Sequence, residues 1–263
     1  MSGGLVYQTY SGGNRLLDRL PEPERDALLP SLQVVGVEVG HRATNVNERF
    51  AQLIFPIDAI FSVCAEFGDG STAEVGTVGR EAFLPCEALG SAPAAYRSAT
   101  CQVAGRVATL PCNALDTAWE SGRELGMLLL RNTTARLFAA EQLTACNLAH
   151  SVVERCARWL LATRDRTGRD EFALTHESLS LMIGVRRPTV SEAAGLLQRQ
   201  GTIRYSRGRM TIVDPAKLLR SSCDCYGMTN VAFDGALDSN GIVTKRTVPP
   251  ERSAAPAGST GSV

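Results

Sequence analysis

The sequence lacks any long apolar run, and this absence excludes the simplest kinds of membrane protein. No segment approaches the roughly 18 consecutive apolar residues that a membrane-spanning helix needs. The first residues, MSGGLVYQTYSGGN, also lack the basic segment followed by an apolar one that marks a secretory signal. The 263 residues, 44% hydrophobic and 21% charged, are enough for one large domain or two ordinary ones. We therefore expect a cytoplasmic protein without a membrane span.

Histidine is scarce and cysteine is scattered, which argues against catalysis, metal binding and disulfides. The three histidines, His41, His150 and His176, have no nucleophile or carboxylate at a recognisable catalytic spacing, so we expect no enzyme and no catalytic residue. The eight cysteines lie singly in apolar segments, which favours reduced, buried thiols. The exception is the close pair Cys223 and Cys225. Its spacing is tighter than an ordinary zinc half-site and no second Cys/His pair lies nearby in the sequence, so we expect a structural or incidental role and no metal site.

The net charge of zero conceals an uneven distribution. Between His150 and Arg220 the sequence has 13 basic and 7 acidic residues, whereas the remainder has 14 basic and 20 acidic residues. A basic block in an otherwise acidic chain is typical of a module that binds a polyanion such as nucleic acid. A solvated charged surface gives the same count, so the charge alone does not decide between the two.

The apolar pattern changes along the chain. Residues 14–20 and 23–29 have the spacing of short helical turns interrupted by prolines. Residues 32–110 contain many short runs rich in valine, isoleucine and phenylalanine, with Asp69-Gly70 as a strong hairpin signal. This pattern predicts an antiparallel barrel or sandwich. No internal repeat is visible.

Residues 119–150 contain few helix breakers and predict one long helix. Leu130, Leu137 and Leu148 fall near heptad spacing, together with small residues between them. An apolar stripe on a long helix between two domains often packs against a copy of itself, so we expect a homodimer. Packing of the stripe on the chain's own β-rich domain is the alternative.

Residues 174–213, LTHESLSLMIGVRRPTVSEAAGLLQRQGTIRYSRGRMTIV, predict a helix, a glycine turn, a second helix and a short hairpin. Thr175 can cap the first helix, Gly184 permits the tight turn, and Pro188 suits the first turn of the second helix. This order is that of a helix-turn-helix with a wing, which places its second helix in the major groove of DNA.

The candidate DNA contacts are polar residues at the start of the second helix and at the tip of the hairpin. Arginine can bond two acceptors on guanine, glutamate can accept from cytosine, and hydroxyl groups suit phosphates or bases. An arginine at the hairpin turn suits a phosphate. The candidates are Arg186, Arg187, Pro188, Thr189, Ser191, Glu192 and Arg207.

These motifs, together with FPIDAIFSVCAEFGDGSTAEVGTVGREAF at residues 55–83, resemble the Crp/Fnr family of bacterial transcription regulators over roughly residues 14–226. The resemblance implies an α+β fold in four parts. These are a cyclic-nucleotide-binding-like β jelly roll for effector sensing at 14–118, a dimerisation helix at 119–150, a winged helix-turn-helix at 151–226 and an unstructured Pro/Ser/Gly-rich tail at 227–263.

The resemblance also implies partners and residue roles. The partners are double-stranded DNA with a palindromic operator, a second copy of the chain, and RNA polymerase. Matched by position, Arg187, Ser191 and Glu192 read bases and Thr189 contacts a phosphate. Pro188 stands where some members have a base-reading glutamate, which implies a different half-site.

The sequence indicates the effector of the β-rich domain less clearly than it indicates the helix-turn-helix. Family members that bind cyclic nucleotides use a Gly-Glu turn and a later Arg-Ser/Thr pair, and the nearest equivalents are Glu81, Arg97 and Ser98. Arg80 interrupts the Gly-Glu pair, and the segment that follows departs from the usual pattern, so a cyclic nucleotide is only one of several candidate effectors.

Other effectors stay open. The N-terminal segment has no group of cysteines, so we expect no iron–sulfur cluster. Haem bound by His41, redox chemistry at Cys86, Cys101 or Cys112, and the absence of any ligand are the alternatives.

An alternative function is a nucleotide-binding regulatory subunit whose C-terminal helices dock on a protein partner. A protein-docking face exposes apolar anchors, whereas the second helix begins with arginines and the wing ends in Arg207, which favours DNA.

Overall fold

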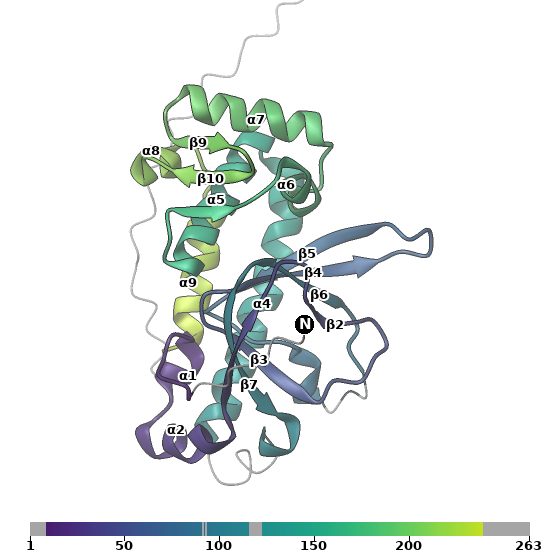
Figure 1. Ribbon diagram of the computed structural model, residues 1–263, viewed down its shortest axis with the longest axis vertical. Coiled ribbons are helices and arrows are strands. Elements are labelled where there is room, and N and C mark those ends of the chain that lie inside the picture. The colour runs from purple at the N-terminus through teal and green to yellow at the C-terminus, as the bar shows by residue number, and fades with distance from the viewer. Residues whose placement is uncertain (1–8, 91, 93, 116–122, 239–263) are drawn as a thin grey trace, which may run out of the picture.

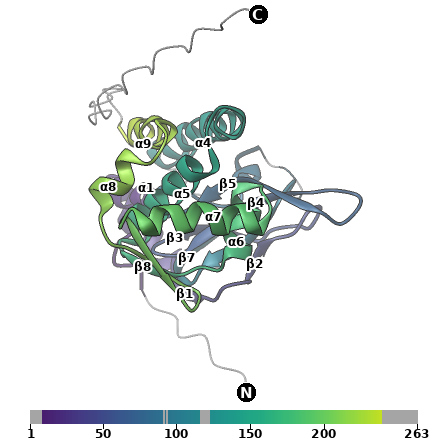
Figure 2. The same ribbon diagram turned by 90° about the horizontal axis from the view of Figure 1, so that it is seen from above.

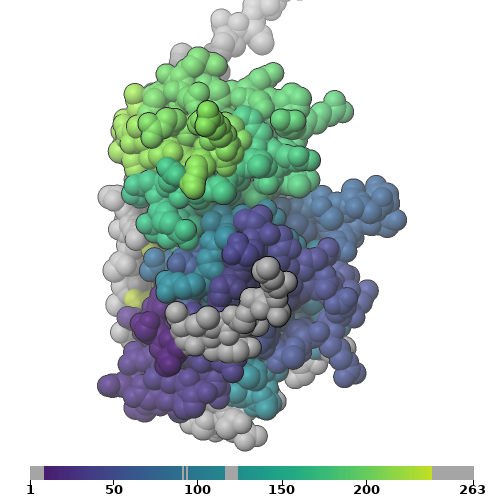
Figure 3. Space-filling model, viewed as in Figure 1, coloured from purple at the N-terminus to yellow at the C-terminus, as the bar shows by residue number. Residues whose placement is uncertain are grey.

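The computed structural model describes residues 9–90, 92, 94–115 and 123–238. An N-terminal β-rich domain is followed by a long helix and then by a C-terminal domain of helices with a small sheet (Figure 1). The C-terminal domain forms a continuous cap over the β-rich domain (Figure 3). The α+β architecture expected from the sequence is confirmed.

Two short helices precede the β-rich domain, as their spacing predicts: α1 (Arg15–Arg19) and α2 (Glu22–Leu28), with a 3-10 turn at Leu29–Ser31. The fully buried Asn14 caps α1 by accepting hydrogen bonds from the backbone N–H groups of Leu16 and Leu17. Its amide nitrogen donates to the carbonyls of Pro56 and Ala82 at 2.9 and 3.1 Å. One buried side chain therefore starts a helix and fastens it to the β-rich domain.

The β-rich domain consists of two antiparallel sheets, one in the order β1-β7-β3 and the other in the order β2-β6-β4-β5. The Asp69-Gly70 hairpin is confirmed: the N–H of Phe67 bonds the carbonyl of Ser71, and Gly70 has a φ of 82°. Its strands are β1 (Gln33–Val37), β2 (Arg42–Thr44), β3 (Gln52–Pro56), β4 (Ile60–Glu66), β5 (Thr72–Val78), β6 (Ser98–Val103) and β7 (Gly105–Pro111).

Phenylalanine side chains occupy two apolar cores of the β-rich domain: Phe61 packs with residues of both sheets, and Phe55 and Phe83 pack with residues of α1 and α4. Phe55, Phe61 and Phe83 are fully buried, and the rings of Phe55 and Phe83 stack with centroids 6.0 Å apart. Aromatic side chains bury large areas, so these rings anchor the position of the sheets.

The long helix α4 (Arg123–Ala149) packs one face on the β-rich domain. Leu125, Leu128 and Leu129 are buried there, and the Asn132 amide donates to the carbonyl of Glu81 at 2.8 Å. The expected start near residue 119 lies outside the described residues. Among the described residues, no helix combines the length and apolar character that a membrane crossing requires.

The C-terminal domain is built on α5 (Val152–Thr167), which begins with a capping box between Ser151 and Glu154 and ends at Gly168 with a φ of 67°. Its remaining elements are β8 (Glu171–Ala173), α6 (His176–Ile183), α7 (Arg187–Arg199), β9 (Ile203–Ser206), β10 (Arg209–Ile212) and α8 (Pro215–Arg220).

Helix α9 (Cys225–Ala236) corrects the expectation of an unstructured tail from residue 227 onward. The helix lies beside α4 (Figure 2). Phe233 and Ala236 enter the core of the β-rich domain, and Asp234 pairs with Arg15 at 2.6 Å. The sequence prediction missed this short helix because it was based on the average composition of residues 227–263, and the Pro/Ser/Gly-rich residues further along the chain dominate that average.

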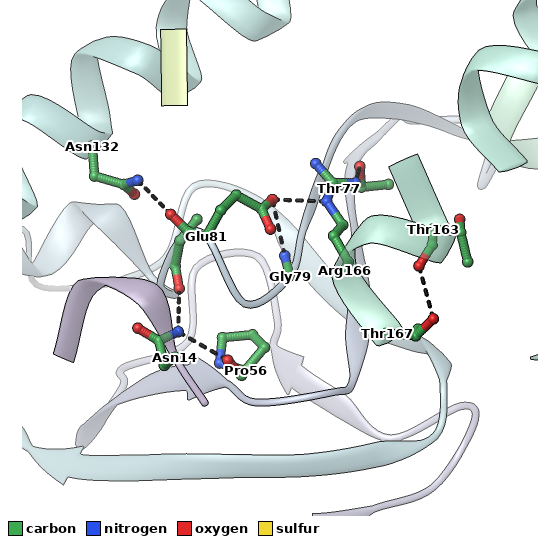
Figure 4. A network of polar contacts seen from close by, with 10 residues as sticks. Asn14, Pro56, Thr77, Gly79, Glu81, Asn132, Thr163, Arg166 and Thr167 are labelled. Carbon is green, nitrogen blue, oxygen red and sulfur yellow. Dashed lines mark hydrogen bonds and ion pairs between the residues drawn. The ribbon is translucent and has the colours of Figure 1, made fainter. Parts of the chain in front are cut away.

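A buried ion pair joins the two domains. The Arg166 guanidinium of α5 lies 2.8 Å from the Glu81 carboxylate, with side-chain exposures of 12% and 7% (Figure 4). Arg166 also donates to the Thr77 hydroxyl. Gly79 leaves room for this arginine, because a Cβ there would lie 2.7 Å from the Arg166 side chain.

Replacing Arg166 by alanine should lower the free energy of unfolding by about 3 kcal/mol, because it leaves the Glu81 carboxylate buried without its partner. Urea unfolding followed by circular dichroism measures the loss. The matched control is Arg164→Ala, which removes a more exposed pair with Asp170 and should cost less than about 1 kcal/mol. Equal losses in the two variants would contradict the importance of the buried pair.

Candidate nucleic-acid interface

Helices α6 and α7 meet at the glycine turn that the sequence predicts. Gly184 adopts a left-handed conformation with a φ of 69°, and its N–H closes α6 by bonding the carbonyl of Ser180. The buried Arg155 of α5 donates a hydrogen bond to the carbonyl of Ile183 just before this turn. Arg155 therefore holds the turn against α5, a role that no local pattern in the sequence indicates.

The start of α7 presents its polar side chains to solvent. Val190, Ala193, Ala194 and Leu197 are buried, as the helical spacing predicts. Pro188 lies in the first turn, where its missing N–H has no helical partner to lose. The exposed side chains on the other side are those of Arg186, Arg187, Pro188, Thr189 and Glu192.

Ser191, the remaining candidate on α7, is half-buried and braces the motif internally. Its hydroxyl lies 2.8 Å from Nδ1 of His176 on α6 and 3.1 Å from the carbonyl of Arg187, to which it donates. The His176 ring stacks on Tyr205 of the wing at 4.2 Å between centroids. These contacts fix α6, α7 and β9 relative to one another, while the base-reading role of Ser191 stays a prediction.

The wing is formed by β9 and β10, which pair antiparallel, and β8 adds a third strand beside β10. Arg207 and Gly208 form its turn with φ values of 49° and 75°, the positive values that a tight hairpin turn requires. The N–H of Tyr205 donates to the Gln198 side chain of α7 at 2.8 Å, so the wing is fixed to that helix.

The arginines at the start of α7 and at the wing tip carry charge that the chain does not neutralise. Within the described residues, Arg186, Arg187 and Arg207 have no carboxylate within 4.0 Å, whereas Arg209 pairs with Glu171 at 2.8 Å. Exposed cations without an internal partner are suited to a polyanion.

A cavity of about 460 Å³ lies between the β-rich domain, α4 and α9. Of the three effector candidates, Arg97 lines it, whereas the Glu81 carboxylate is paired with Arg166 and Ser98 is buried within β6. The structure therefore brings one of the three to the cavity. Their effector-binding role stays a prediction.

Other residues of the cavity were not predicted from the sequence. Arg136 and Arg158 come from α4 and α5, and the α9 residues Thr229, Asn230 and Phe233 close the cavity on one side. The α9 residues could not be predicted as part of a cavity, because the composition of that segment predicted an unstructured tail.

Two of the thiols considered for redox sensing are poorly suited to it. Burial raises the pKa of Cys101 to about 11 and also raises the pKa of Cys86. The reactive species is the thiolate, so a raised pKa makes these cysteines less reactive at neutral pH. Cys112 is half-buried.

Part of the chain matches a known protein family. Residues 154–221 match the family model of the Crp-like helix-turn-helix domain. No curated protein matches the chain.

Similar solved structures come from three bacteria, among others. A Crp/Fnr-family transcriptional regulator from Eubacterium rectale is 16% identical, with a TM-score of 0.58 over 77% of this chain and 95% of that one. A CRP-family regulator from Thermus thermophilus is 21% identical, with a TM-score of 0.60 over 71% and 95%. FixK2 from Bradyrhizobium japonicum is 16% identical, with a TM-score of 0.60 over 73% and 98%.

The fold and the site thus define a winged helix-turn-helix type of protein with a β-roll domain at its N-terminus. More narrowly, the chain carries a Crp-like helix-turn-helix domain within the fold of the Crp/Fnr transcriptional regulators, which confirms the resemblance drawn from the sequence.

The contact between His176 and the wing should make stability depend on pH. Burial and then the nearby Arg187 lower the pKa of His176 below its ordinary value of 6.5. The unfolded chain therefore binds this proton at a higher pH than the folded chain does, and the free energy of unfolding should fall as the pH drops from about 7.5 to 5.5. In the His176→Gln variant the urea midpoint should fall less over this range, and an equal fall would contradict the assignment.

Proposed function

We propose that this protein is a sequence-specific transcription regulator that binds an inverted-repeat operator as a homodimer. The observation that carries the proposal is the set of exposed, unneutralised arginines at the start of α7, mounted on a helix-turn-helix with an arginine-tipped wing. A helix presented in this way enters the major groove with its N-terminal residues on the base edges. The positive end of the α7 dipole also faces the phosphates.

The residues at this surface divide by chemistry into two roles. Arg187 and Glu192 are exposed on the outer face of α7 and can reach guanine and cytosine, with Ser191 beside them. Thr189 suits a phosphate oxygen, and Arg207 at the wing tip suits the backbone of the neighbouring groove. Pro188 offers no hydrogen-bond donor, so the half-site read by this protein should differ from one read by a glutamate there.

A second copy of the chain is the partner that best fits the free face of α4. A seven-residue stripe on this face is exposed, and we call it the α4 stripe. Its leucines include Leu137 at 61% and Leu148 at 87% exposure. Thr134 and Thr144 bond carbonyls of their own helix, so their hydroxyls need no water. The α4 stripe consists of Met127, Leu130, Thr134, Leu137, Glu141, Thr144 and Leu148.

The spacing of the α4 stripe alternates between three and four residues, which is the pattern of a coiled-coil seam. Two α4 helices packed along this seam would be related by a two-fold axis, and the two α7 helices would share that axis. A symmetric pair of reading helices requires a pseudo-palindromic operator, with half-sites one helical turn apart.

The cavity between the β-rich domain, α4 and α9 is the proposed effector site. Cavities of roughly 300–1,000 Å³ accommodate small-molecule ligands, and this one has a volume of about 460 Å³. Arg97 and Arg136 at its wall suit an anionic ligand. Solved neighbours of the same fold include a protein named as cAMP-binding and one named as c-di-GMP-responsive, which supports a nucleotide among the candidates. A contact with RNA polymerase is proposed on the resemblance alone.

Replacing Arg187 by alanine should weaken sequence-specific binding. A genomic binding map supplies the operator, and fluorescence anisotropy then measures the affinity. We expect a loss of about 10–100-fold on the operator and little change on random duplex, because each base-reading arginine contributes about 1–3 kcal/mol of discrimination. Arg207→Ala is the matched comparison, since it should weaken both duplexes alike and reduce the salt slope by about 1. Unchanged operator affinity for the Arg187 variant would overturn the base-reading role, and binding of a protein partner in its place would favour the docking alternative.

Replacing Leu137 by glutamate should convert the dimer to a monomer, because it places a charge in the middle of the apolar seam. Sedimentation equilibrium measures the mass. Val39→Glu, which adds the same charge at an exposed valine beyond β1, should leave the dimer intact. A Leu137 variant that remains a dimer would assign the α4 stripe to some other role.

A further inference from the structure

Four side chains with metal-ligating atoms converge where α4 ends and α9 begins. They are Cys146, His150, Cys223 and Cys225, and their ligand atoms all lie within 4.8 Å of one another. The sequence pattern predicts no metal site, because Cys223 and Cys225 have no second pair beside them in the sequence. The fold supplies that second pair from the end of α4: Cys146 is 77 residues before Cys223, and His150 is 75 residues before Cys225.

Local geometry explains how each pair is presented. Cys146 and His150 are four residues apart, and the N–H of His150 bonds the carbonyl of Cys146 at 3.1 Å. That spacing puts both side chains on one face of the last helical turn. Cys223 lies in the short connection that leads from α8 into α9, and Cys225, beyond Asp224, is the first residue of α9.

Two of the distances within the cluster are close to those of a tetrahedral zinc site. The sulfurs of Cys146 and Cys223 are 3.5 Å apart, and the Cys225 sulfur is 3.5 Å from Nδ1 of His150. Around a zinc ion with Zn–S of about 2.3 Å and Zn–N of about 2.1 Å, two sulfurs lie about 3.8 Å apart and a sulfur and a nitrogen about 3.6 Å apart. The other separations among the four atoms are no more than 4.8 Å, so the atoms need to close by roughly 1 Å at most to share one ion.

The surroundings also suit a cation held by thiolates. The three cysteines are buried and form a cluster of their own, separate from the apolar cores. The Gln142 amide donates to the Cys225 sulfur at 3.1 Å, an outer contact that would orient a ligand. Arg158 of α5 interacts electrostatically with Cys146 and Cys223, and its buried Nε has no hydrogen-bond partner in the described structure. Zinc with three thiolates and a neutral imidazole carries one net negative charge, which this arginine offsets.

We propose that Cys146, His150, Cys223 and Cys225 form a structural Zn²⁺ site that fastens helix α9 to the end of helix α4. Three thiolates and an imidazole select zinc among the common divalent ions, and four protein ligands leave no open position for catalysis. An iron–sulfur cluster places several iron and sulfide atoms between its cysteines and needs a wider cage than this one.

The four-ligand cluster lies at the start of α9 and therefore affects where that helix packs. From Cys225, α9 runs back along α4 and places Phe233 and Ala236 in the core of the β-rich domain. The same helix lines the cavity with Thr229 and Asn230. A zinc ion at the start of α9 would therefore hold one wall of the cavity in place. The complete four-ligand set lies outside residues 154–221, the part of the chain that matches the Crp-like domain.

Metal content of the untagged, full-length protein is the direct test. Protein kept reduced, exposed to excess zinc and desalted should retain about one zinc per chain by plasma mass spectrometry. The double variant Cys223→Ser/Cys225→Ser should retain less than about one tenth of that amount. The matched control Cys64→Ser changes a half-buried thiol outside the cluster and should retain the full equivalent.

Cobalt provides an independent readout on the wild-type chain, in case the double variant does not fold. Reduced protein titrated with Co²⁺ should develop the intense visible bands of a tetrahedral ion and a thiolate charge-transfer band, saturating at one equivalent. His150→Ala, which leaves the three buried thiols in place, should weaken this binding by at least about tenfold. Removing zinc with a chelator should lower the melting temperature of the wild type and leave that of the double variant unchanged.

Two results would overturn the proposal. One is reduced wild-type protein that holds no zinc and gives no thiolate band with cobalt. The other is an intact mass that lacks two hydrogens because Cys146 and Cys223 are joined in a disulfide, together with zinc content that does not recover on reduction. Neither measurement involves DNA, so failure of the zinc site and failure of the proposed regulator function are distinguishable.

Discussion

The position of the winged helix-turn-helix domain on the β-rich domain depends on one buried charge pair. Glu81 and Arg166 meet with little solvent access, and buried charges are tolerated only when they are paired and hydrogen-bonded. The surrounding polar groups meet this condition in part. The N–H of Gly79 donates to one Glu81 carboxylate oxygen, Arg166 donates to Thr77, and the carbonyl of Glu81 accepts from Asn132 of α4, whereas the other Glu81 carboxylate oxygen has no partner among the described residues. The pair therefore links α5 of the C-terminal domain to the β-rich domain and, through the Glu81 carbonyl, to α4.

Local signals in the sequence predicted the parts of the structure that local chemistry determines. Gly184, Pro188 and the Asp69-Gly70 turn act through backbone conformation, so they were visible without any tertiary information. The partners of Arg166 and of Cys223 are 85 and 77 residues away, and nothing in a single sequence indicates which distant residues the fold brings together. Exposed arginines could be assigned to a surface by helical spacing, whereas the bracing contact of Ser191 with His176 required the angle between two helices.

Helix α4 contributes both to the cavity and to the α4 stripe, so it connects the proposed effector site with the proposed dimer contact. One face is buried in the β-rich domain, the opposite face carries the α4 stripe, and Thr134 and Leu137 belong to both the stripe and the wall of the cavity. A molecule in the cavity would touch residues that also face a second copy of the chain. Differential contact of this kind is what a ligand needs in order to shift a conformational equilibrium. Helix α9 adds a second wall from the same side, and its first residues are the ones that the four-ligand cluster holds.

The backbone conformation of Arg207 at the wing tip lowers the stability of the fold. Arg207 has a φ of 49°, a left-handed backbone conformation that costs a residue with a Cβ about 1–2 kcal/mol and that asparagine or glycine would adopt more easily. The chain nevertheless places a long, mobile cation at this strained position, at the point of the wing furthest from its own core. Screens that select only for thermal resistance should therefore favour replacements at residue 207, and on the proposed function the variants that they recover would lose one contact with the phosphate backbone.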